Sequence, residues 1–176
     1  MTPADLMPFC ATDPARYRLL APWSRGDYSI ATNGHVLVRV PRLPDVPENP
    51  DAPSIDKIWA TISEQTVSPL PKIKFPELKV EDCPECDTSG KRHSCPSCRC
   101  ECPLCGGKGK IKENADANIR GVIFDVRYLK LLIALPGLQF SKAPPIAAPA
   151  RFTFAGGEGG LMPRRNSFKN HIVVQE

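Results

Sequence analysis

The sequence predicts an α+β domain, an antiparallel sheet with two helices, that carries an inserted zinc-binding, cysteine-rich module. Three observations support this class. Short alternating segments between turn residues predict strands, two segments carry apolar side chains at helical spacing, and seven of the eight cysteines crowd between Cys83 and Cys105. The 176 residues, 41% of them hydrophobic, suffice for one core. We therefore divide the chain into residues 1–80, an insertion at 81–112, and residues 113–176.

Residues 28–32 and 35–40 predict a β-hairpin in the first part of the chain. They flank Asn33-Gly34, the dipeptide that best accepts the positive φ angles of a two-residue turn. We expect the turn to be centred on these two residues.

A helix is predicted over residues 55–62, with Ser54 as its N-cap. Its apolar residues recur at positions i, i+3, i+4 and i+7, namely Ile55, Ile58, Trp59 and Ile62. Since that spacing gives one apolar stripe, we expect the helix to dock on the main sheet.

A strand that leads into a second helix is predicted in the last part of the chain. Residues 121–124 form the expected strand, Asp125 the N-cap, and Pro136-Gly137 the end of the helix. The cations Arg127 and Lys130 point away from the expected apolar stripe, which consists of Tyr128, Leu131, Leu132 and Leu135.

Further strands are expected after this helix. Residues 151–154 alternate as a strand, and the glycine-rich run 156–160 predicts a turn. The chain is expected to return through Leu161, and residues 172–174 predict a last strand.

The insertion contains three Cys-x-x-Cys pairs, and this spacing predicts structural zinc. Two intervening residues allow both thiolates to reach one tetrahedral ion at about 2.3 Å. The outer pairs have the separation of a four-thiolate site, and they comprise Cys83, Cys86, Cys102 and Cys105. The remaining candidates would form a second site, and they comprise His93, Cys95, Cys98 and Cys100. One or two structural Zn²⁺ ions are therefore expected, and a single ion with spare thiols stays open.

A disulfide framework is the alternative interpretation of so many cysteines. The N-terminus has no basic start followed by an apolar run, and no apolar stretch has the length of a membrane span. We therefore expect a cytoplasmic chain with reduced thiols and no membrane partner. Cys10 stands apart from the cluster and is expected to be a small buried hydrophobe.

Part of the insertion resembles a known zinc-binding unit. The segment Cys102-Pro-Leu-Cys105-Gly-Gly-Lys-Gly109 is similar to the Cys-x-x-Cys-x-Gly-x-Gly unit of J-domain co-chaperones. The first pair, Cys83-Pro-Glu-Cys86-Asp-Thr-Ser-Gly90, keeps only the last glycine. The likeness implies a related zinc fold, and chaperone activity does not follow from it.

Two separated segments outside the insertion resemble a domain of the bacterial sliding clamp, the β subunit of the replicative DNA polymerase. The segment Ala31-Thr-Asn-Gly-His35 resembles the Ala-Thr-Asp-Gly-His hairpin of that family. Residues 121–132, followed by an alternating strand, a glycine-rich turn and Leu161-Met-Pro-Arg164, resemble the closing part of a clamp domain. A clamp subunit has three such domains, whereas this chain suffices for one. Encirclement of DNA would therefore need a homo-oligomer of several copies.

The resemblance implies a DNA-associated, sliding-clamp-like accessory factor of replication or repair, of a kind that would suit a phage protein. It also implies a groove for replication or host proteins. The net charge of +4 permits contact with DNA without sequence preference. The candidate phosphate contacts are Arg127, Lys130, Lys91, Arg92, Lys108 and Lys110.

A protein-interaction adaptor is the alternative function, in which the zinc module binds a host or replication protein and the chain does not encircle DNA. The module would then recover a partner without the scaffold. An enzyme is not expected. No serine or cysteine motif pairs with His35 or His171, and an all-cysteine zinc site has no open position for a substrate.

Overall fold

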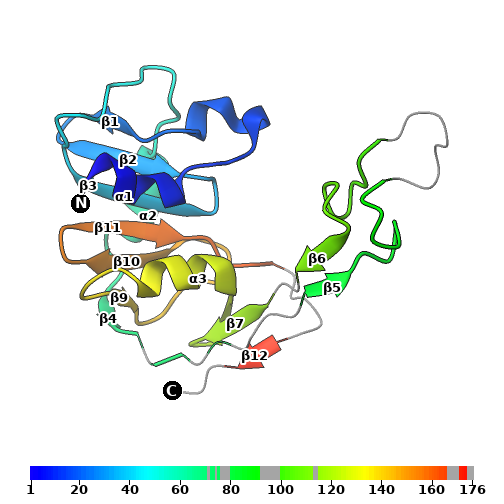
Figure 1. Ribbon diagram of the computed structural model, residues 1–176. Helices are drawn as coiled ribbons and strands as arrows, with labels where there is room; N and C mark the ends of the chain where they lie inside the picture. The colour runs from blue at the N-terminus through cyan, green and yellow to red at the C-terminus, as the bar shows by residue number, and fades with distance from the viewer. Residues whose placement is uncertain are drawn as a thin grey trace.

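A seven-stranded sheet organises most of the chain in the computed structural model (Figure 1), which describes residues 1–70, 72–73, 75, 80–91, 100–112, 115–165 and 171–173. Every neighbouring pair of strands in this sheet is antiparallel. The strand order is β1 (Trp23–Arg25), β2 (Tyr28–Thr32), β3 (Val36–Pro41), β11 (Gly157–Leu161), β10 (Ala150–Phe154), β9 (Gln139–Ser141) and β4 (Val67–Pro69).

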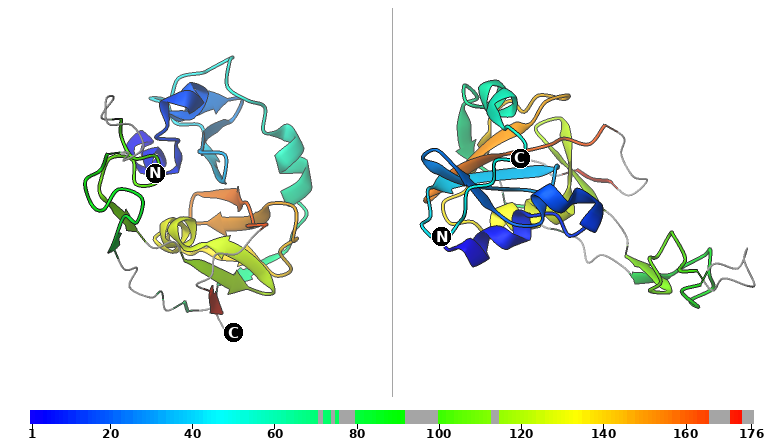
Figure 2. Two further views of the ribbon diagram at one scale, coloured as in Figure 1. Left: turned by 90° about the vertical axis from the view of Figure 1, so that its right-hand side faces the viewer. Right: turned by 90° about the horizontal axis from the view of Figure 1, so that it is seen from above.

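Two smaller sheets are also present in the described part of the chain. In the first, β7 (Asp116–Ile119) pairs antiparallel with β8 (Val122–Asp125) and parallel with β12 (His171–Val173). The second consists of β5 (Val80–Asp82) and β6 (Lys110–Lys112), which pair at the two ends of the cysteine-rich segment. We call residues 80–91 and 100–112 the knuckle and the other described residues the body. The knuckle stands apart from the body (Figures 1 and 2).

Helices are few and short, and together with the mainly antiparallel sheet they confirm the predicted α+β class. The described helices are α1 (Pro3–Leu6), the 3₁₀ helices η1 (Met7–Phe9) and η2 (Pro14–Leu19), α2 (Asp56–Ile62) and α3 (Val126–Ile133). Across the described parts of the chain, none of them has the length and apolar character needed to cross a membrane.

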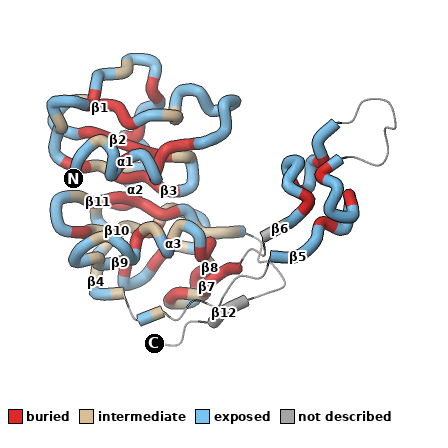
Figure 3. The backbone as a smooth tube through the Cα atoms, viewed as in Figure 1, coloured by how far each residue is buried: buried red, intermediate tan, exposed pale blue. Residues whose placement is uncertain are grey.

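The two faces of the main sheet carry separate cores. Buried residues follow one another along its strands (Figure 3). Side chains alternate across a strand, so Val36 and Val38 face the larger core while Leu37 faces the smaller one. The larger core packs against α1, α3, β7 and β8, and the smaller one packs against Ile55 and Trp59 at α2. The helices α2 and α3 therefore cover opposite faces of the sheet (Figure 2).

The predicted hairpin is confirmed, but its turn lies one residue further along the chain. The Asn33 N–H donates to the Val36 carbonyl at 3.4 Å, so Gly34 and His35 occupy the centre of the turn, with Gly34 at φ +89°. The Asn33 side chain explains the shift, because its Oδ1 accepts from the N–H groups of His35 and Val36 at 2.9 and 3.1 Å.

The helix predicted at residues 55–62 is present, with one fewer buried position than expected. The N-cap is Ile55 and not the predicted Ser54. Ser54, one residue before the N-cap, still accepts a hydrogen bond from the Asp56 N–H at 3.3 Å. Ile62 is fully buried, but Ile58 is 40% exposed. In α3 the Asp125 N-cap is confirmed, and the stripe also includes Leu129, which is fully buried.

The turn predicted over residues 156–160 is wrong, because Gly157–Leu161 forms the central strand β11. The turn is confined to Ala155 and Gly156. Aromatic rings take the space that β11 leaves open. Phe152 and Phe154 lie opposite Gly159 and Gly157 in the ladder, and a Cβ on either glycine would lie 2.4 or 2.5 Å from the ring of its partner.

Candidate metal centre and basic pocket

Four cysteines of the knuckle form a compact cluster. The sulfur atoms of Cys83, Cys86, Cys102 and Cys105 all lie within 4.8 Å of one another, and all four residues are buried and outside any disulfide. The Sγ atoms of Cys83 and Cys102 are 3.8 Å apart, and those of Cys86 and Cys105 are 3.7 Å apart. Sulfurs bound to tetrahedral zinc at about 2.3 Å are about 3.8 Å apart. The cluster is therefore positioned to hold a metal ion with the geometry of zinc, in the predicted outer pairing.

The two cysteine pairs lie in matching backbone turns nineteen residues apart. Cys83 N–H donates to the Gly109 carbonyl at 3.0 Å, and Cys102 N–H donates to the Gly90 carbonyl at 2.8 Å. Each pair is followed by three residues with positive φ, at equivalent positions: Asp87, Thr88 and Gly90 in one turn, and Gly106, Gly107 and Gly109 in the other. The first unit thus forms the same turn as the second although it lacks two of the glycines.

Glycine is required where the two turns touch. A Cβ on Gly109 would lie 2.0 Å from the Thr88 carbonyl oxygen, and a Cβ on Gly90 would lie 2.2 Å from that of Gly107. These contacts explain why the first unit keeps only its last glycine. Asp87 and Thr88 instead adopt the left-handed conformation at an energetic cost, which the surrounding turn has to offset.

The environment of the four thiols favours a bound cation. Burial raises the pKa of Cys83, and burial together with the neighbouring thiols raises the pKa of Cys86 to about 12. Burial acts in the same direction on Cys105, but the Gly109 N–H, 3.2 Å from its sulfur, and the other thiols bring its pKa down to about 7. Full deprotonation therefore requires the positive charge of a metal ion, whose binding releases protons.

The other predicted ligands are not brought together by the described structure. His93, Cys95 and Cys98 lie outside the described residues, and Cys100 is exposed, so the second zinc site stays a prediction. Cys10 is buried in the larger core, as predicted, where burial raises its pKa to about 11.

The predicted DNA contacts fall into two groups. Arg127 and Lys130 are exposed on α3, while Lys91, Lys108 and Lys110 are exposed on the knuckle, which lies apart from α3 (Figure 1). Arg92 lies outside the described residues. The two groups therefore do not form one continuous surface.

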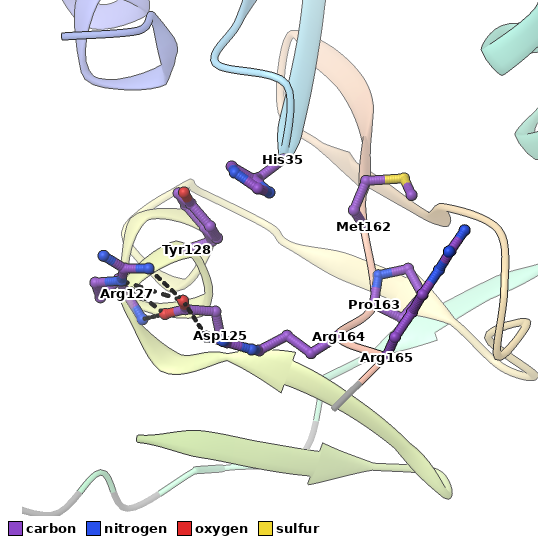
Figure 4. Close-up of a pocket in the computed structure, with 8 residues that line it drawn as sticks. All are labelled: His35, Asp125, Arg127, Tyr128, Met162, Pro163, Arg164 and Arg165. Atoms are coloured by element: carbon purple, nitrogen blue, oxygen red, sulfur yellow. Dashed lines mark hydrogen bonds and ion pairs between the residues drawn. The ribbon is translucent and has the colours of Figure 1, made fainter. Parts of the chain in front are cut away.

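Arg127 lines a basic pocket of about 370 Å³ that sequence reasoning did not foresee (Figure 4). Three chain segments meet here: the β2–β3 turn, the start of α3, and the residues after β11. The lining residues are His35, Asp125, Arg127, Tyr128, Met162, Pro163, Arg164 and Arg165. The sequence signal for this site is the pair of arginines after Met162-Pro163. These arginines are far from α3 along the chain, so the sequence does not show that they lie beside Arg127.

Asp125 organises the arginines at one side of the pocket (Figure 4). Its carboxylate accepts from Arg127 Nη2 at 2.6 Å and from Arg164 Nη1 at 3.0 Å, and Oδ1 also accepts from the Arg127 N–H at 2.8 Å as the N-cap of α3. Burial by itself would raise the pKa of Asp125. The hydrogen bonds from Arg127 and the charge of Arg164 outweigh burial and hold that pKa below its usual value.

Two aromatic rings form another wall of the pocket. The rings of His35 and Tyr128 stack with centroids 5.5 Å apart at an interplanar angle of 19°. Burial and the nearby charges of Arg16 and Arg127 lower the pKa of His35. Burial and these positive charges therefore disfavour protonation of His35, and the Asp125 carboxylate opposes them only in part.

The Asp125→Asn substitution is expected to destabilise the body by about 2 kcal/mol at neutral pH, because hydrogen bonds to a charged group are lost while asparagine keeps the N-cap. The carboxylate has a lowered pKa in the folded state, so its stabilising effect is complete at neutral pH and is lost as the pH falls below about 4. Urea unfolding followed by the fluorescence of Trp23 and Trp59, both in the body, measures the difference. An equal difference between the two proteins at pH 7 and at pH 3 would contradict the ion-pair assignment.

Comparison with known proteins gives no relative for this chain: no family model, no curated protein and no solved structure matches it. The fold and the sites above therefore stand on their own geometry.

Proposed function

We propose that this protein is a zinc-bearing, sliding-clamp-like accessory factor of DNA replication or repair, without catalytic activity. One observation carries the proposal. The two segments that resemble a clamp domain, around His35 and around residues 121–132 with Met162 and Arg164, come from distant parts of the chain and meet at one place. Residues of a shared functional surface are expected to converge in this way.

The basic pocket supplies the proposed contact with DNA. Arg127, Arg164 and Arg165 line it, and Arg16 lies beside it in a neighbouring pocket that shares His35 and Arg127. Guanidinium groups bind phosphate oxygens through paired hydrogen bonds, and such contacts carry little sequence preference.

An apolar groove next to the basic pocket supplies the proposed contact with a partner protein. It has a volume of about 160 Å³ and shares His35 and Met162 with the basic pocket. Val36, Leu37 and the exposed Ile58 line its floor and rim. Apolar side chains at the surface of this groove would be covered by an apolar segment of a replication or host protein.

The proposal does not include a closed ring, because each edge strand of the main sheet is blocked at one position. At β1, the Ser24 N–H donates to the Pro47 carbonyl at 2.8 Å, so part of this edge is already occupied. At β4, Pro69 has no N–H group to offer a neighbouring strand. In addition, α2 and α3 lie on opposite faces of the sheet, so only one of them would face a central channel.

Salt-dependent DNA binding tests the proposal. We expect fluorescently labelled oligonucleotides to bind at low ionic strength, with the logarithm of the association constant falling linearly with the logarithm of salt concentration. The Arg165→Gln substitution should reduce that slope by about one unit. Lys57→Gln is the matched control, since it removes one exposed charge from α2 on the opposite face. Absence of salt-sensitive binding to both duplex and single-stranded DNA would refute the proposed DNA contact.

The alternative function is a protein-interaction adaptor that acts through the knuckle. It is favoured by Leu104, an apolar side chain that is 50% exposed between the candidate ligands Cys102 and Cys105. The same titration separates the two functions, because an adaptor of this kind needs no salt-sensitive affinity for DNA.

A further inference from the structure

The basic pocket carries more positive than negative side chains. Three guanidinium groups line it, from Arg127, Arg164 and Arg165. A fourth, from Arg16, lies in the neighbouring pocket, which Asp13 also lines. The carboxylates of Asp125 and Asp116 pair with Arg127 and Arg164. Both carboxylates are buried and engaged by arginine, with Asp116 3.5 Å from Arg164 Nε. Counted over both pockets, four arginines face three carboxylates, so one positive charge remains without a counter-charge among these residues.

Three of the arginines, Arg16, Arg127 and Arg164, are held in place by contacts inside the protein. Arg127 donates to Asp125 through Nε and Nη2. Arg164 is fixed by the same carboxylate, and Arg16 donates from Nη1 to the Asn33 carbonyl beside the β2–β3 turn. A guanidinium has five N–H donors, so these contacts orient each group and still leave it donors for an anion. A preorganised cluster of this kind loses little side-chain entropy when it binds.

The shape of the site selects among anions. A volume of about 370 Å³ lies in the range of small-ligand pockets, which is about 300–1,000 Å³. A phosphodiester inside a nucleic-acid chain carries one charge, and the chain on both sides of it must also pass into and out of the pocket. A terminal phosphate monoester carries nearly two charges at neutral pH and has three oxygens available.

We propose that the basic pocket binds a terminal phosphate monoester, as carried by a 5′-phosphorylated end of a nucleic acid or by a free nucleotide. The arginines bind the phosphate oxygens, and His35 and Tyr128 form the wall beside the attached nucleoside. For nucleic-acid ends, this inference rests on the proposed function, which is contact with DNA. It adds that the protein recognises the ends of a strand rather than any stretch of its backbone.

The test compares two single-stranded oligonucleotides of one sequence, both labelled at the 3′ end, with either a 5′-phosphate or a 5′-hydroxyl. The phosphorylated strand is expected to bind about ten- to a hundredfold more tightly to the full-length protein, the range for hydrogen bonds to a charged group. Arg165→Gln should remove most of that preference without unfolding the body, because Arg165 is exposed. Lys57→Gln should retain it.

Competition identifies the source of the phosphate. Displacement of the phosphorylated strand by AMP at similar concentrations would assign the pocket to free nucleotides, while displacement only by other 5′-phosphorylated strands would assign it to nucleic-acid ends. Equal, salt-sensitive binding of both oligonucleotides would overturn the inference and leave the proposed DNA contact intact. Binding of AMP without affinity for either oligonucleotide would overturn the DNA contact and leave the phosphate site. A glutamate-rich peptide that competes as well as AMP would show an acidic-peptide site instead.

Discussion

Replacing Cys83 with serine is expected to abolish tight zinc binding and to unfold the knuckle while the body keeps its fold. A closed four-thiolate site loses its tetrahedral geometry when one ligand is removed. The knuckle has little else to hold it, because its buried cluster consists of the four cysteines with Ile111 packed against them. Apparent zinc-binding energies of such sites are about 10–16 kcal/mol near neutral pH, and they are folding energy for the segment that binds.

Native mass spectrometry of the untagged protein measures this effect, since one spectrum gives the number of metal ions and of subunits. Wild type should carry at least one zinc ion, and Cys83→Ser or Cys105→Ser should carry one fewer. Cys100→Ser is the matched control, because Cys100 lies in the same segment outside the four-sulfur cluster. If Cys100→Ser carried one zinc ion fewer than wild type, that loss would establish the predicted second site.

The body provides an independent readout for the same variants. Both tryptophans, Trp23 and Trp59, lie at the smaller core of the main sheet, so their fluorescence follows the body alone. We expect the same melting transition in wild type and in Cys83→Ser. A large fall in the melting temperature of the tryptophan signal would show that the knuckle contributes to the core of the body.

The sequence predicted those elements that depend on residues close together along the chain. The pairing of Cys83/Cys86 with Cys102/Cys105 follows from ligand spacing, and Asp125 as an N-cap follows from its place before an apolar helix. The hairpin was also predictable, because Asn33-Gly34 is a strong turn signal. Its centre was not, since the Asn33 side chain can cap the backbone one residue further on.

The features that sequence reasoning missed depend on residues that are distant along the chain. The glycine-rich run was interpreted as a turn because its strand character comes from the rings of Phe152 and Phe154 on the neighbouring strand. The basic pocket was missed for the same reason. Arg164 meets Asp125 only once β11 has been placed at the centre of the sheet.

The Gly159→Ala substitution is expected to destabilise the body by about 3 kcal/mol, at the upper end of the usual cost of overpacking. Gly159 lies in the central strand β11 between β3 and β10. Its added Cβ would lie 2.0 Å from the Leu37 carbonyl oxygen and 2.4 Å from the Phe152 ring, so backbone and a fully buried side chain must both move. Thermal unfolding followed by tryptophan fluorescence should show a decrease in Tm of roughly 10 °C.

Gly160→Ala provides a control on the same strand. Side chains of adjacent strand residues point to opposite faces, and the nearest atom to a Cβ on Gly160 is the flexible end of Ile62, Cδ1, at 3.0 Å. Both substitutions bring the same gain in intrinsic strand preference, so their difference isolates the close contact with Leu37 and Phe152. We expect Gly160→Ala to cost about 1 kcal/mol or less. Equal destabilisation by the two substitutions would mean that an added side chain has the same effect on either face of β11. The close packing of Phe152 on Gly159 would then not be what fixes this strand at the centre of the sheet.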